Sequence, residues 1–234
     1  MENQHFWKAK TSLILYLLLL AAILLGSIIT AAVLLGIGVD LQNLTFPSAL
    51  LSLPINEGLL LVITLIFAKE NGANLTKLGL KKPNLKTLVI ASFVALFLLL
   101  LAMGISIIEE IILGPDPDAQ LIIDAILPRN LLQLIALISI SIALVGPTEE
   151  LAFRGFVQRG FETSFGKTTG LIIASILFGL LHGLNSLRSI IPVTIISLFL
   201  GYVWQKTNGN TTAVAWIHGI YDAITIALVY FAYL

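Results

Sequence analysis

The sequence predicts an all-α, polytopic helical membrane protein with about seven transmembrane helices, or eight as the alternative. Of its 234 residues, 58% are hydrophobic and 11% are charged, whereas an average soluble domain has about 25% charged residues. Several apolar runs approach or exceed the roughly 20 residues that a helix needs to cross a bilayer. These runs are continuous in Leu, Ile and Ala, so they lack the alternation that a membrane β-barrel strand shows. The composition therefore excludes a soluble globule and argues against a barrel.

The apolar runs extend over the whole chain, so we expect residues 1–234 to form a single transmembrane domain. The first run begins at Leu13, exceeds a signal-peptide core and lacks a convincing cleavage site, which favours a first membrane span. Cysteine is absent and the net charge is zero. Disulfides and thiolate metal sites are thus excluded, and the net charge gives no indication of nucleic-acid binding. The expected spans are 13–37, 46–68, 87–108, about 131–157, 168–182, 189–204 and 211–234.

The basic residues predict the orientation of these spans. With a cytoplasmic N-terminus, eleven Lys and Arg residues fall on the inner side, and only Arg129 and Arg188 fall on the outer side. Lys and Arg in short loops set membrane orientation, so we expect a multi-pass protein of the cell membrane with its N-terminus in the cytoplasm. The eleven are Lys8, Lys10, Lys69, Lys77, Lys81, Lys82, Lys86, Arg154, Arg159, Lys167 and Lys206.

Two adjacent glutamates stand out among the few ionisable residues within the spans. An ionisable group at membrane depth costs at least ~2.5 kcal/mol, so it is rarely present without a function. Glu150 and Arg154 are four residues apart in the favourable order, so they are expected to neutralise each other. Glu149 is rotated by about 100° from Glu150 and has no such partner. Glu149 is therefore the carboxylate that is free to do chemistry.

The residues around these glutamates predict their depth in the membrane. Pro147 is expected to kink or restart the helix, with Thr148 as its cap. Glu149 then lies ~15 Å along the helix from Arg159 at the inner surface, which is inside the hydrocarbon. His182, counted from the preceding loop at 158–167, lies ~22 Å deep. The predicted spans therefore place the two side chains at different depths.

Two histidines add to the set of polar residues within the spans. His182 follows Phe178 by one helical turn, and His218 and Asp222 share a helix face at positions i and i+4. A lone intramembrane histidine is more often a packing residue than a catalyst. Two histidines, one with an acid a turn away, beside the unpaired Glu149, indicate a site.

Glu, His and Asp without Ser or Cys indicate hydrolysis by an activated water. A carboxylate and an imidazole can remove a proton from water, and further donors can stabilise the oxyanion that forms on a carbonyl. The same side chains, Glu149, His182, His218 and Asp222, could instead bind zinc, which would activate the water as a Lewis acid. The preferred interpretation requires no cofactor, and zinc is the alternative. A third alternative is a buried ion-pair network that only fixes helix packing.

At these residues the chain resembles the CPBP family of intramembrane proteases, also called the CAAX protease and bacteriocin-processing or Abi family. The family includes the type II CAAX prenyl endopeptidases. Its EExxxR, FxxxH and HxxxN/D motifs appear here, in order, as "EELAFR" (149–154), "FGLLH" (178–182) and "HGIYD" (218–222). The resemblance covers about 145–225, and the three motifs together are more specific than any one alone.

The resemblance implies an intramembrane endopeptidase of the glutamate type or a metalloprotease, with a cavity open to the cytoplasm. By analogy, Glu149 activates water with help from His182, while His218 and Asp222 bind the oxyanion. The supporting residues would be Glu150, Arg154 and Phe178. Expected partners are membrane lipid and a membrane-associated or prenylated protein or peptide that enters from the bilayer or the cytoplasm.

One position departs from the prenyl endopeptidases. Their third motif usually ends in Asn, which can donate a hydrogen bond, whereas the ionised Asp222 of this chain is an acceptor only. Asp222 must then be protonated, orient His218 or bind a metal. The sequence leaves these three alternatives open.

Two further function classes remain as alternatives. A non-catalytic scaffold or immunity protein would keep the helices but would tolerate loss of the charged residues. An ion-coupled transporter also uses buried Glu, His and Asp, but transporters usually show paired repeats, which we do not find in this chain. Glu57 could line a substrate entrance, but we expect it to hydrogen-bond to a neighbouring helix.

Overall fold

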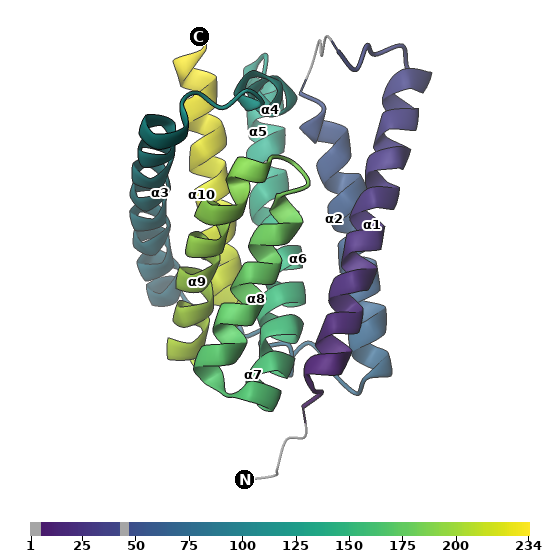
Figure 1. Cartoon of the computed structure of the whole chain (residues 1–234), viewed down its shortest axis with the longest axis vertical. Helices are drawn as coiled ribbons and strands as arrows, with labels where there is room; N and C mark the ends of the chain where they lie inside the picture. The colour runs from purple at the N-terminus through teal and green to yellow at the C-terminus, as the bar shows by residue number, and fades with distance from the viewer. Residues whose placement is uncertain (1–5, 43–46) are drawn as a thin grey trace.

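The computed structural model describes residues 6–42 and 47–234, which form helices joined by turns and short loops (Figure 1). The described part contains no strand, so the predicted all-α fold is confirmed. Its elements in chain order are α1 (Ala9–Gly36), α2 (Ala49–Glu70), α3 (Leu85–Leu113), α4 (Ala119–Ile126), α5 (Leu131–Ile140), η1 (Ser141–Val145), α6 (Gly146–Glu150), η2 (Leu151–Gln158), α7 (Arg159–Phe165), α8 (Lys167–His182), η3 (Leu187–Ser189), α9 (Ile190–Lys206) and α10 (Thr211–Ala232).

Six helical segments of the described residues are long and apolar enough to cross a membrane. The predicted span 168–182 corresponds to α8, whose 16 residues reach ~24 Å, less than the ~30 Å of a bilayer core. The polytopic membrane fold is thus confirmed, with six full-length helices and one shorter one. The predicted start of the second span, residue 46, lies outside the described residues. The six segments are Ala9–Gly36, Ala49–Glu70, Leu85–Leu113, Leu131–Phe165, Leu187–Lys206 and Thr211–Ala232.

The fourth span is one helix of 35 residues, Leu131–Phe165. The predicted restart at Pro147 is wrong, because helical residues continue through it and Thr148 is buried within the helix instead of capping it. The π-helical segments η1 and η2 flank α6 on both sides. Proline lacks an N–H and crowds the preceding turn, and the wider π-helical turn before Pro147 relieves that crowding.

Residues 158–167 were expected to form a loop, but most of them are helical. Helix α7 continues to Phe165, and Gly166 alone turns the chain into α8, with a φ of 81° that favours glycine. Two polar residues of this stretch bond to each other, since the buried Gln158 donates to Glu162 at 2.7 Å. Local hydrogen bonds of this kind let a polar sequence remain helical at the membrane boundary.

Helix α10 packs against α3, α5, α6 and α9 and so lies inside the bundle (Figure 1). Two glycines allow its approach to the fourth span. A Cβ on Gly146 would collide with the backbone of α10 at Ala215 and Gly219, and a Cβ on Gly219 would collide with Ile142. This close contact places His218 and Asp222 of α10 beside α6.

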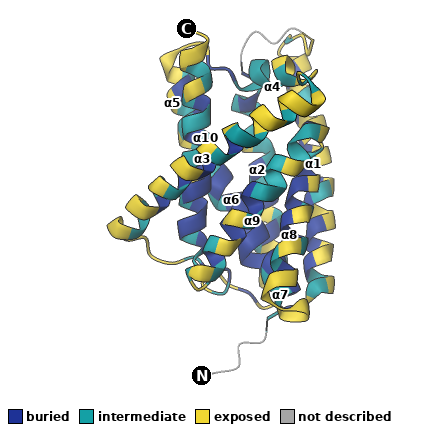
Figure 2. Cartoon of the chain, turned by 60° about the vertical axis from the view of Figure 1, so that its left-hand side comes forward, coloured by how far each residue is buried: buried dark blue, intermediate teal, exposed yellow. Residues whose placement is uncertain are grey.

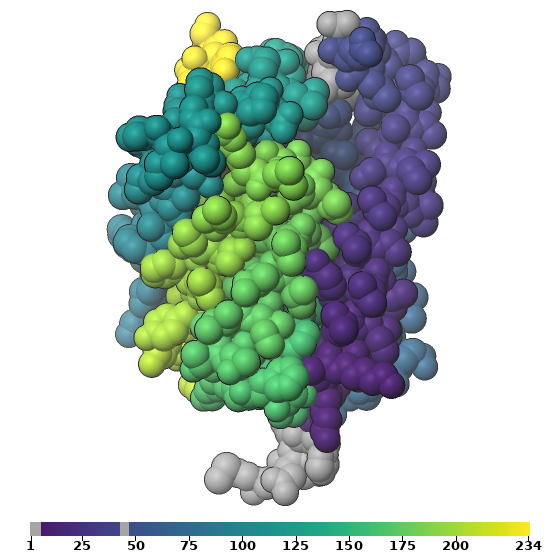
Figure 3. All heavy atoms as spheres, in the orientation of Figure 1, coloured from purple at the N-terminus to yellow at the C-terminus, as the bar shows by residue number. Residues whose placement is uncertain are grey.

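The remaining helices enclose this centre. Helices α1 and α2 pack against each other, and the lower half of α1 contacts α7 (Figures 1 and 3). Figure 2 shows exposed residues along the outward side of α3 and buried residues on the helices in the middle of the bundle. The exposed side chains include many large apolar residues of α1 and α3, for example Leu17, Phe93 and Ile111. An apolar exterior of this kind fits a lipid environment.

Candidate active site

Glu149 and His182 lie at a similar depth in the bundle. Because α7 continues the fourth span to Phe165, Glu149 lies ~24 Å from the lower end of its helix. His182 lies ~22 Å from the start of α8, which begins immediately after the Gly166 turn. The mismatch of depth that the sequence predicted disappears, since it came from ending the helix too early.

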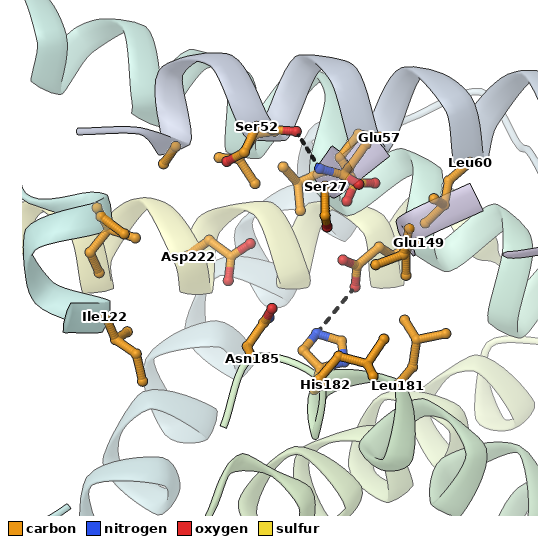
Figure 4. Close-up of a pocket in the computed structure, with 18 of the residues that line it drawn as sticks. Ser27, Ser52, Glu57, Leu60, Ile122, Glu149, Leu181, His182, Asn185 and Asp222 are labelled. Carbon is orange, nitrogen blue, oxygen red and sulfur yellow. Dashed lines mark hydrogen bonds and ion pairs between the residues drawn. The ribbon is translucent and has the colours of Figure 1, made fainter. Parts of the chain in front are cut away.

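The carboxylate of Glu149 faces both imidazoles (Figure 4 shows His182). Its Oε2 lies 3.9 Å from Nε2 of His182 and 3.8 Å from Nε2 of His218. Asp222 Oδ2 lies 3.6 Å from the same His218 nitrogen. Glu149 is 9% exposed, and no described residue forms a hydrogen bond with its Oε2. The structure therefore brings the four predicted site residues together, and their catalytic roles stay predictions.

Glu150 and Arg154 form the buried ion pair that their spacing predicts. Arg154 Nη1 donates to Glu150 Oε1 at 2.8 Å, and Nη2 donates to the hydroxyl of Ser197 at 2.9 Å. The guanidinium lies 4.7 Å from the centroid of the Phe178 ring. These contacts link η2, α8 and α9, because each partner comes from a different element.

The hydrogen bonds of the two histidines fix their tautomers. Nδ1 of His218 lies 2.9 Å from Glu150 Oε1, and Nδ1 of His182 lies 3.0 Å from the carbonyl oxygen of Phe178. An ion-paired carboxylate and a carbonyl only accept hydrogen bonds, so each Nδ1 carries the hydrogen. Both Nε2 atoms are therefore turned toward Glu149, and the free nitrogen of each ring is available to a reacting group.

The ring of Phe178 packs against both imidazoles. Its ring centroid lies 4.5 Å from that of His182 and 6.2 Å from that of His218. Gly179 and Gly183 allow α9 to approach α8 beside these rings, because a Cβ on either would collide with Ile190. The FxxxH motif thus supplies a packing surface together with a histidine.

The site residues line a cavity of about 590 Å³. Sequence reasoning missed Asn185, which lies beside Asp222 and His182 in Figure 4. Asn185 follows His182 by three residues, and this short spacing from a motif residue was the available signal. Apolar residues of α4, which no sequence motif indicated, complete the cavity. They are Leu121, Ile122, Ala125 and Ile126.

Glu57 also belongs to this cavity, together with Asn56 and Ser52 of the same helix α2 (Figure 4). Glu57 is 5% exposed, and no described residue forms a hydrogen bond with its Oε2. It is close enough to Glu149 to interact with it electrostatically. The expectation that Glu57 only bonds to a neighbouring helix is therefore wrong.

The His, Asp and Glu side chains of the site are of the types that bind metal ions. Within residues 6–42 and 47–234, no group of three His, Asp or Glu side chains is arranged to hold a metal ion. The zinc alternative, with Glu149, His182, His218 and Asp222 as ligands, stays a prediction.

These observations define a class of protein. It is an integral, multi-pass helical membrane protein that holds a carboxylate and two imidazoles at a cavity between its helices.

The family follows from a comparison with family models. Residues 131–224 match the model described as "Type II CAAX prenyl endopeptidase Rce1-like", a range that includes all three motifs but less than half of the chain. Over these residues the chain is similar to the CAAX-type intramembrane proteases, and the resemblance seen in the motifs is confirmed. Helices α1, α2 and α3 lie outside the matched range. Searches of curated proteins and of solved structures find no match.

Proposed function

We propose that the protein is an intramembrane endopeptidase in which Glu149, assisted by His182, activates a water molecule. One observation carries the proposal: a buried carboxylate oxygen lies 3.9 Å and 3.8 Å from the free nitrogens of two imidazoles. Direct hydrogen bonds from nitrogen to oxygen are shorter, about 2.7–3.2 Å. A separation of this size suits one water between the groups.

The reaction uses the carboxylate as a general base. Glu149 takes a proton as the water oxygen bonds to the carbonyl carbon of the scissile peptide. The tetrahedral intermediate then expels the amine, which receives that proton as the C–N bond breaks. His182 positions the water through Nε2, since its Nδ1 is held by the carbonyl of Phe178.

His218 is the proposed donor to the oxyanion. Its Nδ1–H is held by Glu150, so a second donor on Nε2 requires the imidazolium form. Three carboxylates surround this ring, those of Glu150, Asp222 and Glu149, and their charges favour the imidazolium. Of the alternatives that the sequence left open for Asp222, we propose that it orients and charges His218.

The proposed substrate is a membrane-associated protein or peptide. The matching family model describes prenyl endopeptidases, and the apolar wall formed by α4 supports a lipid-modified or lipid-proximal segment. The substrate would reach the cavity from the bilayer or from the aqueous side on which the cavity lies.

Replacing the proposed base tests the function. Glu149→Gln keeps the shape of the side chain but removes its basicity, so we expect kcat for a prenylated, internally quenched peptide to fall by about 10²–10⁴-fold. The measurement is cleavage in proteoliposomes that contain the purified full-length protein. Glu110→Gln, an exposed residue of α3, is the control and should leave the rate unchanged.

Two outcomes would contradict this proposal. Full cleavage by Glu149→Gln would show that Glu149 is not the general base. A normal cellular phenotype of this variant at normal expression would favour the scaffold or immunity protein. The zinc alternative is tested on the same preparation, since a metal-dependent enzyme would contain stoichiometric zinc and would lose its activity to a chelator.

A further inference from the structure

One wall of the cavity carries polar groups that the proposed reaction does not use. Ser52, Asn56 and Glu57 lie on α2, and Figure 4 places Ser52 and Glu57 across the cavity from His182. Helix α2 lies outside the range matched by the family model, 131–224. Its polar groups are therefore a feature of this chain beyond the three motifs.

Two buried acceptors on this wall lack donors. Asn56 Nδ2 donates to the carbonyl oxygen of Ser52 at 2.9 Å, which fixes the orientation of the amide and leaves Oδ1 without a donor among the described residues. Glu57 Oε2, on the adjacent residue, also lacks a donor in this part of the chain. A buried acceptor without a partner costs about 1–3 kcal/mol, more when it is charged. Asn56 Oδ1 lies against Gly26 of α1, so Glu57 Oε2 is the acceptor that most directly indicates a ligand that supplies a donor.

The charge of the cavity favours a cationic ligand. Three carboxylates line it, those of Glu57, Glu149 and Asp222, and no Lys or Arg does so among the described residues. Of the nearby cations, Arg154 is already paired with Glu150, and His218 in its proposed imidazolium form offsets one of the three carboxylates. A neutral donor could satisfy one acceptor but would leave the excess of carboxylates uncompensated.

We propose that Glu57 is a specificity-determining residue that binds an ammonium group of the substrate, with Asn56 Oδ1 as a second acceptor. An ammonium group has three donors and no acceptor, which matches the two unpaired acceptors, Glu57 Oε2 and Asn56 Oδ1. The group is a Lys side chain near the scissile bond or a free α-amine, and the two sources share this chemistry. The inference rests on the proposed function, because it concerns the substrate of the same cavity.

The test compares cleavage of peptides that differ only in this group. The full-length protein in proteoliposomes is given quenched peptides with Lys or norleucine at each position around the scissile bond. A second pair of peptides has a free or an acetylated N-terminus. We expect Lys at one position, or the free amine, to raise kcat/KM roughly tenfold or more, because a hydrogen bond to a charged group is stronger than one between neutral groups.

Variants of α2 then locate the effect. In Glu57→Gln, the ratio of kcat/KM for the peptide with the ammonium group to kcat/KM for its neutral counterpart should fall toward one. The reason is that the amide cannot neutralise the ammonium. Glu70→Gln, the same substitution at an exposed position of the same helix, should keep the wild-type ratio. If Glu57→Gln does not fold, competition in the wild type replaces it: free butylammonium should inhibit cleavage of the Lys peptide more strongly than the neutral 1-butanol does at the same concentration.

The failures of the two proposals are distinguishable. A wild type without any preference for an ammonium group, or a Glu57→Gln variant with the wild-type ratio, would overturn the role of Glu57. Equal inhibition by butylammonium and by 1-butanol would do the same. The proposed function fails instead when Glu149→Gln cleaves the norleucine peptide as fast as the wild type.

Discussion

At the scale of single residues, Arg154 holds the candidate site together from outside the cavity. It is 1% exposed and contacts Glu150, Ser197 and Phe178. Glu150 in turn holds Nδ1 of His218. Arg154 thus contacts both the Phe178 ring that packs against the histidines and the Glu150 carboxylate that orients His218.

Removing this cation should destabilise the protein strongly. Arg154→Leu removes the guanidinium from the buried pair and leaves Glu150 with His218 alone, and breaking a buried pair costs about 3–5 kcal/mol. We expect a matching fall in the free energy of unfolding, measured by denaturation in detergent.

Arg129→Leu is the matched control for Arg154→Leu. It breaks an exposed pair with Asp124 at 3.4 Å, and pairs of that kind contribute only about 0–1 kcal/mol. Similar losses for both variants would show that burial of Arg154 does not determine its contribution.

At the scale of elements, the fit of α10 against the fourth span positions the histidine of the third motif. Gly146 and Gly219 remove the side chains that would separate the two helices. The flanking segments η1 and η2 are π-helical, and π-helical turns occur frequently at functional sites. Helix geometry, more than any loop, therefore sets the distance between Glu149 and His218.

A methyl group at this contact should disturb both stability and catalysis. Gly146→Ala puts a Cβ against the backbone of α10, and overpacking of this kind costs about 1–3 kcal/mol. We expect a lower melting temperature together with slower peptide cleavage, because His218 must move away from Glu149.

Gly104→Ala serves as the control on α3. No atom lies within 4 Å of a Cβ built there, and alanine is the better helix former by about 1 kcal/mol. This variant should be as stable as the wild type or more so, and equal behaviour of the two variants would contradict the packing argument.

At the scale of the whole molecule, two expectations about orientation exclude each other. The cavity is lined by α4, the start of α2 and the end of α8, which lie toward the end of the bundle opposite the N-terminus (Figure 1). The basic residues predict a cytoplasmic N-terminus, whereas the resemblance implied a cavity open to the cytoplasm. Arg154 is buried within the bundle and does not count as an inner-surface charge, but ten basic residues remain on that side.

We expect the basic residues to determine the orientation. The chain has no cysteine, so single cysteines can be labelled cleanly with a membrane-impermeant maleimide on intact cells. Asp118→Cys, beside α4, should react from outside, and Thr168→Cys, at the start of α8, should react only after permeabilisation. The reverse pattern would place the cavity on the cytoplasmic side, as the resemblance implied.

The sequence alone determined the membrane fold and the residues that the structure brings together. Hydrophobic runs of membrane length leave few alternatives to helices, because every backbone polar group within lipid needs an internal partner. The cost of burying charge made Glu149, His182, His218 and Asp222 stand out. The i,i+4 pairing of Glu150 with Arg154 needed only the geometry of one helix.

Only the tertiary structure decided the depth and the surroundings of these residues. The polar stretch after residue 158 remains helical because its side chains bond to one another, and this extension places Glu149 and His182 at a similar depth. Glu57, Asn56 and Asn185 enter the cavity through contacts between helices that are distant in sequence. Hydropathy reports how apolar each segment is along the chain, but the face that a buried polar residue presents depends on its neighbours in space.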